Sequence, residues 1–188
     1  MGKLFQYAGI AASVVLIAFG IGAVMIGLNG RDRVGTELAR EQIVGTPDST
    51  IPNQLVNSGS EAQAFAKVMR KHTLEATGGK TYAQMPQYLT TSGKGTSDTA
   101  AAATDPQTGA PTSTPARTIW VTETALTTAL NTAYFAESMA TFVIAMGFAL
   151  LLTGIGFLVL SLRVLRQPAA ESQKRAQPRT ASAVPVPH

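Results

Sequence analysis

The sequence contains the uncharged stretch LFQYAGIAASVVLIAFGIGAVMIGL at residues 4–28 and a second one, MATFVIAMGFALLLTGIGFLVLSL, at residues 139–162. As a helix, the first would reach roughly 37 Å, which is more than the thickness of a bilayer's hydrocarbon core. A chain of 188 residues has no other apolar mass that could cover all faces of both helices. The sequence therefore predicts two transmembrane helices.

The first stretch has two interpretations, because Lys3 and the amino terminus also resemble the start of a secretory signal peptide. Its uncharged length exceeds the usual apolar core of a signal peptide, and IGLNGRDR after it offers no small-residue cleavage site. We therefore expect an uncleaved membrane anchor.

Basic residues near the predicted spans indicate the orientation. Residues 163–188 hold five Lys or Arg residues and one Glu, whereas residues 29–138 hold nine basic and ten acidic residues. Because short basic segments stay in the cytoplasm, we expect residues 1–3 and the tail 163–188 to be cytoplasmic, with 29–138 extracytoplasmic. Arg31 and Arg33 count against this orientation without reversing it. The formal net charge of +4 then reflects topology, and no nucleic-acid partner is expected.

The segment between the spans is predicted to be largely helical. Ser60 and Gln63 form a capping-box pattern, and Gly78 with Gly79 gives a stop signal, which together predict an amphipathic helix over residues 60–77. A second helix over residues 119–137 contains no glycine or proline and should continue into the second span. After the first span, a helical stalk and a break at Gly30 or Gly35 are both consistent with the sequence.

Residues 90–116, TTSGKGTSDTAAAATDPQTGAPTSTPA, have no aromatic and no large aliphatic side chain. Such a segment buries too little apolar surface to offset its conformational entropy, so we expect it to be disordered, like the basic tail. The predicted fold class is mainly α: a two-helix transmembrane hairpin with a long, largely helical extracytoplasmic segment that contains this disordered Thr/Ala/Pro-rich excursion.

The element Gly-Gly-Lys-Thr, residues 78–81, resembles the end of a phosphate-binding loop. That loop requires a glycine at position 74, which is Leu here, and it must follow a strand, whereas these residues follow a predicted helix. We therefore interpret the two glycines as a helix C-cap and expect no nucleotide.

The sequence offers no recognisable catalytic or metal-binding constellation. It contains no cysteine and only two histidines, His72 and His188, so that an iron site with two His ligands and one carboxylate has too few ligands in one ordered domain. His72 and Glu75 could share a helix face, but such a pair lacks two or three ligands of a metal site. We expect no catalytic residue, no cofactor and no metal.

Two residue sets are candidates for intermolecular contact. One is a contact surface around the end of the first outer helix; it comprises His72, Glu75, Lys80, Tyr82 and Trp120, although Trp120 is also expected in a small outer core. The other is a ridge of small residues in the second span, Thr141, Ala145, Ala149 and Thr153, at a spacing that suits close helix packing. This ridge could pack on the first span, on a second copy or on another membrane protein.

Three blocks carry a family resemblance: GSEAQAFAKVMRKHTLEATGGKTYAQM, REQIVGTPD and ARTIWVTETALTTALNTAYFAE. They resemble an uncharacterised family of two-span membrane proteins from actinobacteria and related bacteria, over most of residues 37–162. The resemblance implies a bacterial plasma membrane protein with two passes. Some members carry the label of an aromatic ring-opening dioxygenase, which the histidine count argues against.

The sequence therefore predicts a non-enzymatic structural or interaction protein, a scaffold or accessory. It would contact the lipid bilayer and either a second copy or another membrane protein. The alternative is a small-molecule- or ion-binding accessory subunit of a membrane transport system, with its ligand near His72, Glu75, Lys80 and Tyr82.

Overall fold

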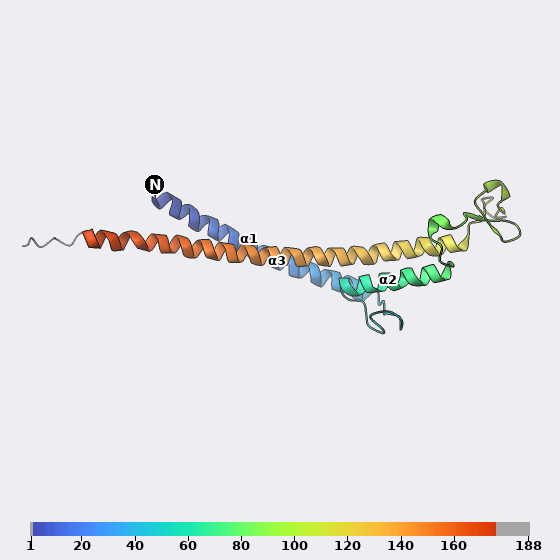
Figure 1. Cartoon of the computed structure of the whole chain (residues 1–188), viewed down its shortest axis with the longest axis horizontal. Helices are drawn as coiled ribbons and strands as arrows, with labels where there is room; N and C mark the ends of the chain where they lie inside the picture. Colours follow the sequence, from blue (N-terminus) through green and yellow to red (C-terminus); the bar gives the residue numbers. More distant parts are fainter. Residues whose placement is uncertain (1, 176–188) are drawn as a thin grey trace, which may run out of the picture. The chain divides into compact units, whose positions relative to one another are not determined.

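The computed structural model describes the backbone of residues 2–175 and the side chains of residues 7–163. It confirms a mainly helical fold, with α1 (Gly2–Arg40), α2 (Gly59–Ala76) and α3 (Pro115–Arg175) as its long helices (Figure 1). Short elements connect α2 to α3: η1 (Tyr82–Gln84), β1 (Tyr88–Leu89), β2 (Gly95–Thr96) and η2 (Thr99–Ala101).

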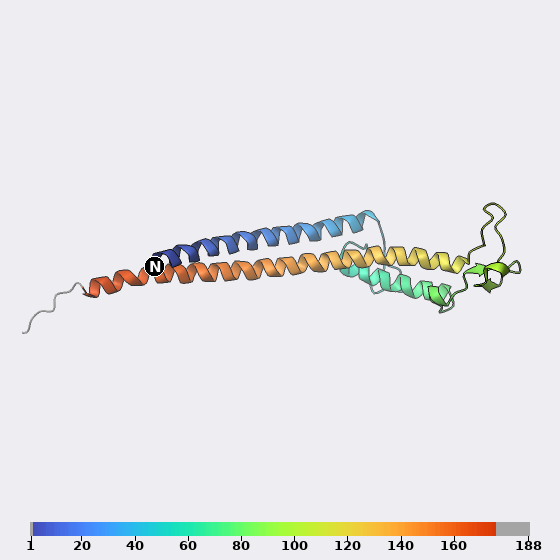
Figure 2. The same cartoon turned by 90° about the horizontal axis from the view of Figure 1, so that it is seen from above.

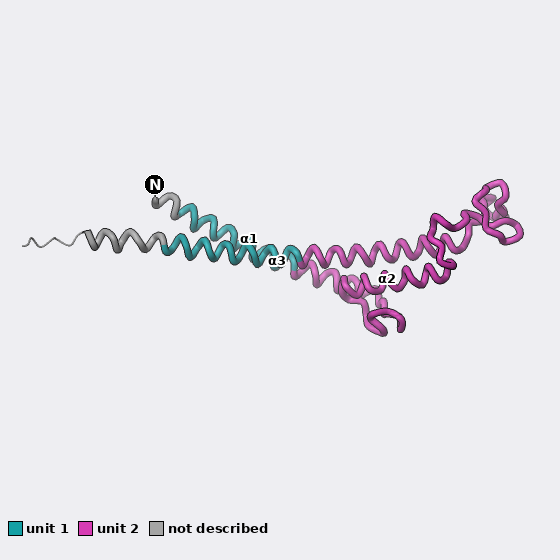
Figure 3. The backbone as a smooth tube through the Cα atoms, in the orientation of Figure 1, with its two compact units in different colours: residues 1–27, 142–188 teal, residues 28–141 magenta. Residues whose placement is uncertain are grey.

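The chain divides into two units, coloured separately in Figure 3. The first, here called the apolar unit, comprises residues 1–27 and 142–188. The second, called the central unit, comprises residues 28–141. Helices α1 and α3 contribute residues to both units.

The apolar unit contains the two stretches that are long and apolar enough to cross a membrane, within Tyr7–Arg40 and Pro115–Arg163. Most of their large apolar side chains are exposed, for example Phe19, Leu152 and Phe157. A core helix of a globular protein would bury such side chains, whereas a helix in a bilayer presents them to lipid. The exposure therefore agrees with two membrane-spanning helices.

Within the apolar unit, α1 and α3 approach closely at small residues spaced seven apart. Gly20 on α1 and Gly147 and Gly154 on α3 are buried. A Cβ added to Gly20 would lie 2.8 Å from the Gly147 carbonyl oxygen, and one added to Gly147 would lie 2.9 Å from the Gly20 carbonyl oxygen. Both distances are too short for a Cβ, so glycine is required for this backbone contact. A seven-residue repeat keeps one face of each helix toward its neighbour.

The small-residue ridge predicted from the sequence lies elsewhere. Thr141, Ala145, Ala149 and Thr153 are all exposed. Of the three alternatives for this ridge, packing on the first span therefore does not hold, and a second copy or another membrane protein stays a prediction. The hydroxyls of Thr141 and Thr153 instead donate to the carbonyls four residues before them, at 2.9 and 2.8 Å. Spacing by four identifies a helix face, but it does not say which of two small-residue faces meets the neighbour.

The central unit has its own apolar core, to which all three long helices contribute. In both Figure 1 and Figure 2, α2 lies beside the first turns of α3. The core combines Leu38 of α1, Leu130 of α3, side chains of α2 and two residues of the connection before α2; the remaining members are Ile51, Val56, Ala62, Phe65, Ala66 and Val68. Helix α1 continues unbroken through Gly30 and Gly35 and contributes Leu38 to this core. Of the two alternatives for the residues after the first span, the structure therefore has the helical stalk.

The N-cap of α2 lies two residues before the predicted one. Ser58 is the N-cap and accepts a hydrogen bond from the Glu61 amide, so the expected cap at Ser60 is wrong. Ser58 and Glu61 have the same spacing as a capping box, and the Glu61 carboxylate accepts from the Asn57 amide at 2.9 Å. At the other end Gly78 and Gly79 have positive φ, and the Gly79 amide donates to the Leu74 carbonyl at 2.7 Å. The C-cap interpretation of these glycines agrees with this geometry.

A carboxylate from α3 fixes the start of α2. Glu137 accepts a hydrogen bond from the Gly59 amide and forms an ion pair with Arg31 at 3.2 Å. A carboxylate at a helix N-terminus complements the unsatisfied amides and the helix dipole. Gly59 is buried at this contact, and a Cβ there would lie 2.8 Å from the Cα atom of Tyr134, so the site has no room for a side chain.

Residues 90–116 differ from the disordered segment that their composition predicts. Strands β1 and β2 pair antiparallel, and further backbone bonds join Leu89 to Thr112 and to Ala103. Asp98 and Asp105 accept hydrogen bonds from backbone amides two residues later, at 2.9 and 2.7 Å. Backbone pairing and aspartate turns organise this segment, and neither depends on the burial of large side chains.

Helix α3 also extends beyond the predicted end of the second span at residue 162, up to Arg175. For residues 163–175 the structure thus has helix where the sequence predicts a disordered tail. Several residues of this stretch, such as the two alanines, Glu171 and Gln173, favour helix. The rest of the tail, 176–188, and Met1 lie outside the described residues.

Candidate functional site

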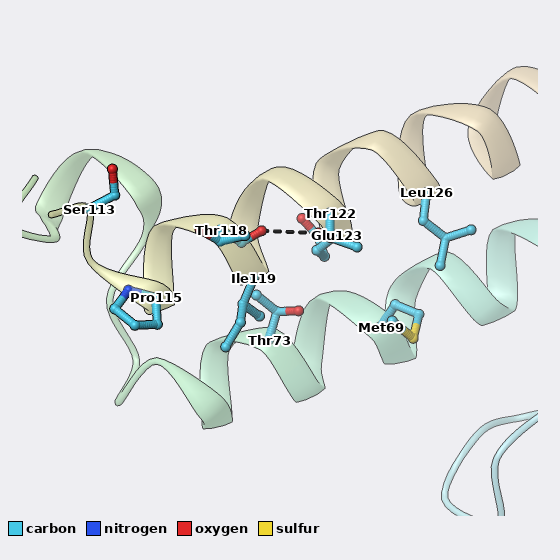
Figure 4. A pocket seen from close by; sticks show the side chains of 9 residues that line it. All are labelled: Met69, Thr73, Ser113, Pro115, Thr118, Ile119, Thr122, Glu123 and Leu126. Atoms are coloured by element: carbon cyan, nitrogen blue, oxygen red, sulfur yellow. Dashed lines mark hydrogen bonds between the residues drawn. The ribbon is translucent and has the colours of Figure 1, made fainter. Parts of the chain in front are cut away.

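An open groove of about 510 Å³ lies between α2 and α3 in the central unit (Figure 4). Its lining is largely apolar, with hydroxyl groups distributed along it and a single carboxylate. The lining residues are Met69 and Thr73 of α2, Ser113 before α3, and Pro115, Thr118, Ile119, Thr122, Glu123 and Leu126 of α3.

The carboxylate of this groove belongs to Glu123, whose side chain is only 2% exposed. Its Oε2 atom lies 3.6 Å from Nη1 of the half-exposed Arg70 and accepts a hydrogen bond from the Thr124 hydroxyl at 3.3 Å. Burying a carboxylate is costly unless close hydrogen bonds replace the lost water. Both contacts are long, so neither is the short, charge-assisted hydrogen bond that a carboxylate can accept.

Trp120 lies one helical turn from Glu123 and is 2% exposed. Its indole Nε1 donates to the Lys80 carbonyl at 3.0 Å, and the Arg70 guanidinium lies 4.2 Å from the ring centroid. The sequence-based choice of Trp120 as a contact-surface residue is therefore wrong, while its expected place in the outer core agrees with the structure. A tryptophan whose ring and N–H group both have partners inside the fold fixes α3 to the end of α2.

Lys80 and Tyr82 follow the end of α2 and stay exposed. The Tyr82 ring stacks against the Arg117 guanidinium, 3.8 Å from its centroid. It lines a second, more polar groove of about 480 Å³ with Gln87, Tyr88, Ser113, Arg117, Thr118 and Val121. Neither His72 nor Glu75 lines this groove, so the four residues chosen from the sequence do not form one ligand site there.

His72 instead belongs to an exposed charge cluster with Asp48 and Lys71. The Asp48 Oδ2 atom lies 2.9 Å from the Lys71 Nζ atom and 3.0 Å from His72 Nε2, and Glu75 lies 3.9 Å from Lys71. The sequence does not indicate that Asp48 belongs to this cluster. Lys71 and His72 lie 23 and 24 positions after it, and no local pattern relates residues so far apart. The cluster ties the connection before α2 to the surface of that helix.

The hydrogen bond from Lys71, then those from His72 and Thr46, hold the pKa of Asp48 well below its ordinary value. The pKa of Lys71 is raised, first by its hydrogen bond to Asp48 and then by the charges of Asp48 and Glu75. A lowered carboxyl pKa contributes stability that is present above the ordinary value of 3.8 and is lost as pH falls below it. A raised lysine pKa contributes stability that is present below 10.5 and is lost as pH rises above it.

We expect the Asp48→Asn variant to unfold at a lower temperature than the wild type at neutral pH. The difference should shrink as pH falls below about 4, because the wild-type carboxylate then gains a proton when the chain unfolds. Thermal unfolding of both detergent-solubilised proteins from neutral pH to about pH 3 measures it. A difference that stays constant over this range would contradict the assignment.

Within residues 7–163, no group of three or more His, Asp or Glu side chains is placed to hold a metal ion. Comparison of the chain with known protein families, with curated proteins and with solved structures finds no match in any of the three. The functional argument therefore depends on the geometry and chemistry of the central unit.

Proposed function

We propose that this protein is a two-span protein of the bacterial plasma membrane with a non-enzymatic interaction role, and that its central unit self-associates outside the cytoplasm through the exposed face of α3. The observation that supports self-association is the absence of charge from that face. Between residues 118 and 136 the only charged residue is Glu123, which is buried.

The two helices of the same unit differ sharply in this respect. Helix α2 exposes Lys67, Arg70, Lys71 and Glu75, as a helix in water ordinarily does. Helix α3 instead exposes threonine, alanine and large apolar side chains, with Val121 58% and Phe135 64% exposed. Depletion of charge together with exposed apolar and aromatic side chains is characteristic of the core of a protein interface.

A second copy of the chain is the partner that this composition favours. Membrane insertion gives all copies one orientation, so two of them related by a two-fold axis would bring the same face of α3 together. A charged face would repel its own copy in such a contact, whereas an uncharged face of small residues allows close approach.

The absence of cysteine makes this proposal directly testable. We expect Thr128→Cys, on the exposed face of α3, to form a disulfide-linked dimer when membranes are treated with a mild oxidant. Lys67→Cys, on the charged face of α2, is the matched control and should remain monomeric. Denaturing gel electrophoresis without reductant measures both.

The self-association proposal fails if none of Val121→Cys, Thr128→Cys and Phe135→Cys yields a dimer of the chain. A cross-link from these positions to a different protein would also contradict it, because a different membrane protein would then be the partner. Labelling the same cysteines in intact cells with a membrane-impermeant maleimide tests the orientation, and protection from the reagent until lysis would overturn the extracytoplasmic assignment.

A further inference from the structure

We propose that the groove between α2 and α3 is a binding site for a small organic amine, in which Glu123 receives the ammonium group and the apolar lining receives the hydrocarbon part. This site can be tested separately from self-association, because Val121, Thr128 and Phe135 do not line the groove. Its basis is the combination of a buried carboxylate, an open apolar groove and hydroxyl groups around them (Figure 4).

The charge of the groove selects a cation. Glu123 is the only charged residue among those that line it, and neither Lys nor Arg is among them. The Arg70 guanidinium lies 3.6 Å from Oε2 of this carboxylate and also stacks on Trp120. An ammonium group in the groove would supply the short, charge-assisted hydrogen bond that this carboxylate lacks.

The rest of the lining selects an amine with an apolar body over a bare metal ion. Met69, Ile119 and Leu126 offer hydrocarbon surface, and the volume of about 510 Å³ is that of a small-molecule site. A divalent cation would need several more oxygen ligands of carboxylate or carbonyl type than one Glu provides. Hydroxyl oxygens of Thr73 and Thr118, which also line the groove, can accept the remaining hydrogen bonds that an ammonium group donates.

The wild-type protein in lipid nanodiscs tests the site with three probes of one size and shape: benzylamine, benzyl alcohol and benzoate. Trp120 is the only tryptophan of the chain, and Arg70 contacts both its ring and the Glu123 carboxylate, so its fluorescence should respond when Glu123 gains a new partner. We expect a saturable change with benzylamine, a response at least about tenfold weaker with benzyl alcohol, and none with benzoate. Equal responses to benzylamine and benzyl alcohol, or no response to benzylamine up to its solubility limit, would overturn the proposal.

Two variants locate the binding. Glu123→Gln should reduce the affinity for benzylamine to about that of benzyl alcohol. Since this change can also weaken the link between α2 and α3, Thr122→Phe provides a second test, because it fills the groove from an exposed position. It should abolish the response while leaving the unfolding temperature near that of the wild type.

The control is Glu41→Gln, which removes one negative charge from an exposed site outside this groove. It should bind benzylamine as the wild type does. If Glu41→Gln lowers the affinity as much as Glu123→Gln, the effect is general electrostatics and the site assignment is wrong. If both Glu123→Gln and Thr122→Phe retain the preference for the amine over the alcohol, benzylamine binds elsewhere and the proposal falls.

Discussion

Replacing Gly45 by alanine is expected to destabilise the central unit by about 3 kcal/mol or more and to lower its unfolding temperature by roughly 10 °C. A Cβ at this position would lie 1.9 Å from the carbonyl oxygen of Ile51, which belongs to the backbone and has no rotamer by which to avoid it. The connection before α2 would have to open. Ile51, a buried member of the core, would then lose its place.

The hydrogen bonds of this connection explain why the clash cannot be relieved cheaply. The Gly45 amide donates to the Gln54 carbonyl and the Gly45 carbonyl accepts from the Asn53 amide, both at 2.9 Å. Moving Gly45 away from Ile51 would break these bonds or distort them. Thermal unfolding of the detergent-solubilised protein, followed by circular dichroism, measures the effect.

Gly30→Ala is the matched control, because it makes the same chemical change in the same unit. Its Cβ would meet the Ala140 Cβ at 3.4 Å, which is an ordinary contact, and it would lie inside α1. Alanine favours a helix over glycine by about 1 kcal/mol, so this variant should unfold at the wild-type temperature or above it. If the two variants unfold at the same temperature, Gly45 does not pack closely against the Ile51 carbonyl, and the assignment is wrong.

The features that the sequence predicts well are those whose physical cause is local. The uncharged stretches at residues 4–28 and 139–162 indicate long apolar helices from composition alone. The end of α2 at Gly78 follows from the preference of glycine for the left-handed conformation. Even the error at the start of α2 is small, because Ser58 and Ser60 offer the same cap chemistry two residues apart.

The features that the sequence does not predict depend on which residues meet in space. Asp48 approaches Lys71, and Arg70 approaches Glu123, over separations that no periodicity encodes. A buried glutamate on a helix has the same sequence signal as an exposed one, so Glu123 attracts no notice until its burial is known. Trp120, which the sequence analysis included in a contact surface, is ambiguous in the same way. A large aromatic residue can serve either a core or a surface, and its sequence does not say which.

The contact between the two helices of the apolar unit leads to the second large effect. Small residues occur on more than one face of α3, and the structure places Gly147, not Ala145 or Ala149, against α1. Where hydrocarbon surrounds both helices, burial of apolar surface does not hold them together, and close backbone packing must do so instead. A single bulky side chain on the contact face should therefore separate them.

We expect Gly147→Leu to separate the two helices, because even the first side-chain atom would lie 2.8 Å from the Val24 side chain and 2.9 Å from the Gly20 carbonyl oxygen. Gly156→Leu places the same side chain on the same helix, but no atom lies within 4 Å of its Cβ, so the contact should survive. A pair of added cysteines reports the difference. Gly9→Cys and Ser161→Cys suit this purpose, because the Cβ atoms at these positions would be 3.7 Å apart, a separation that a disulfide bridges without strain.

In isolated membranes treated with oxidant, the cysteine pair alone and the pair combined with Gly156→Leu should both form the intramolecular disulfide nearly completely. Combined with Gly147→Leu, the pair should form only a small fraction of it, because the ends of the helices no longer stay within reach. Mass spectrometry of the proteolysed protein quantifies the cross-linked peptide. Equal yields in the Gly147→Leu and Gly156→Leu backgrounds would show that the glycine contact does not hold the helices together, and a reduced yield in both would mean that any added bulk disturbs them.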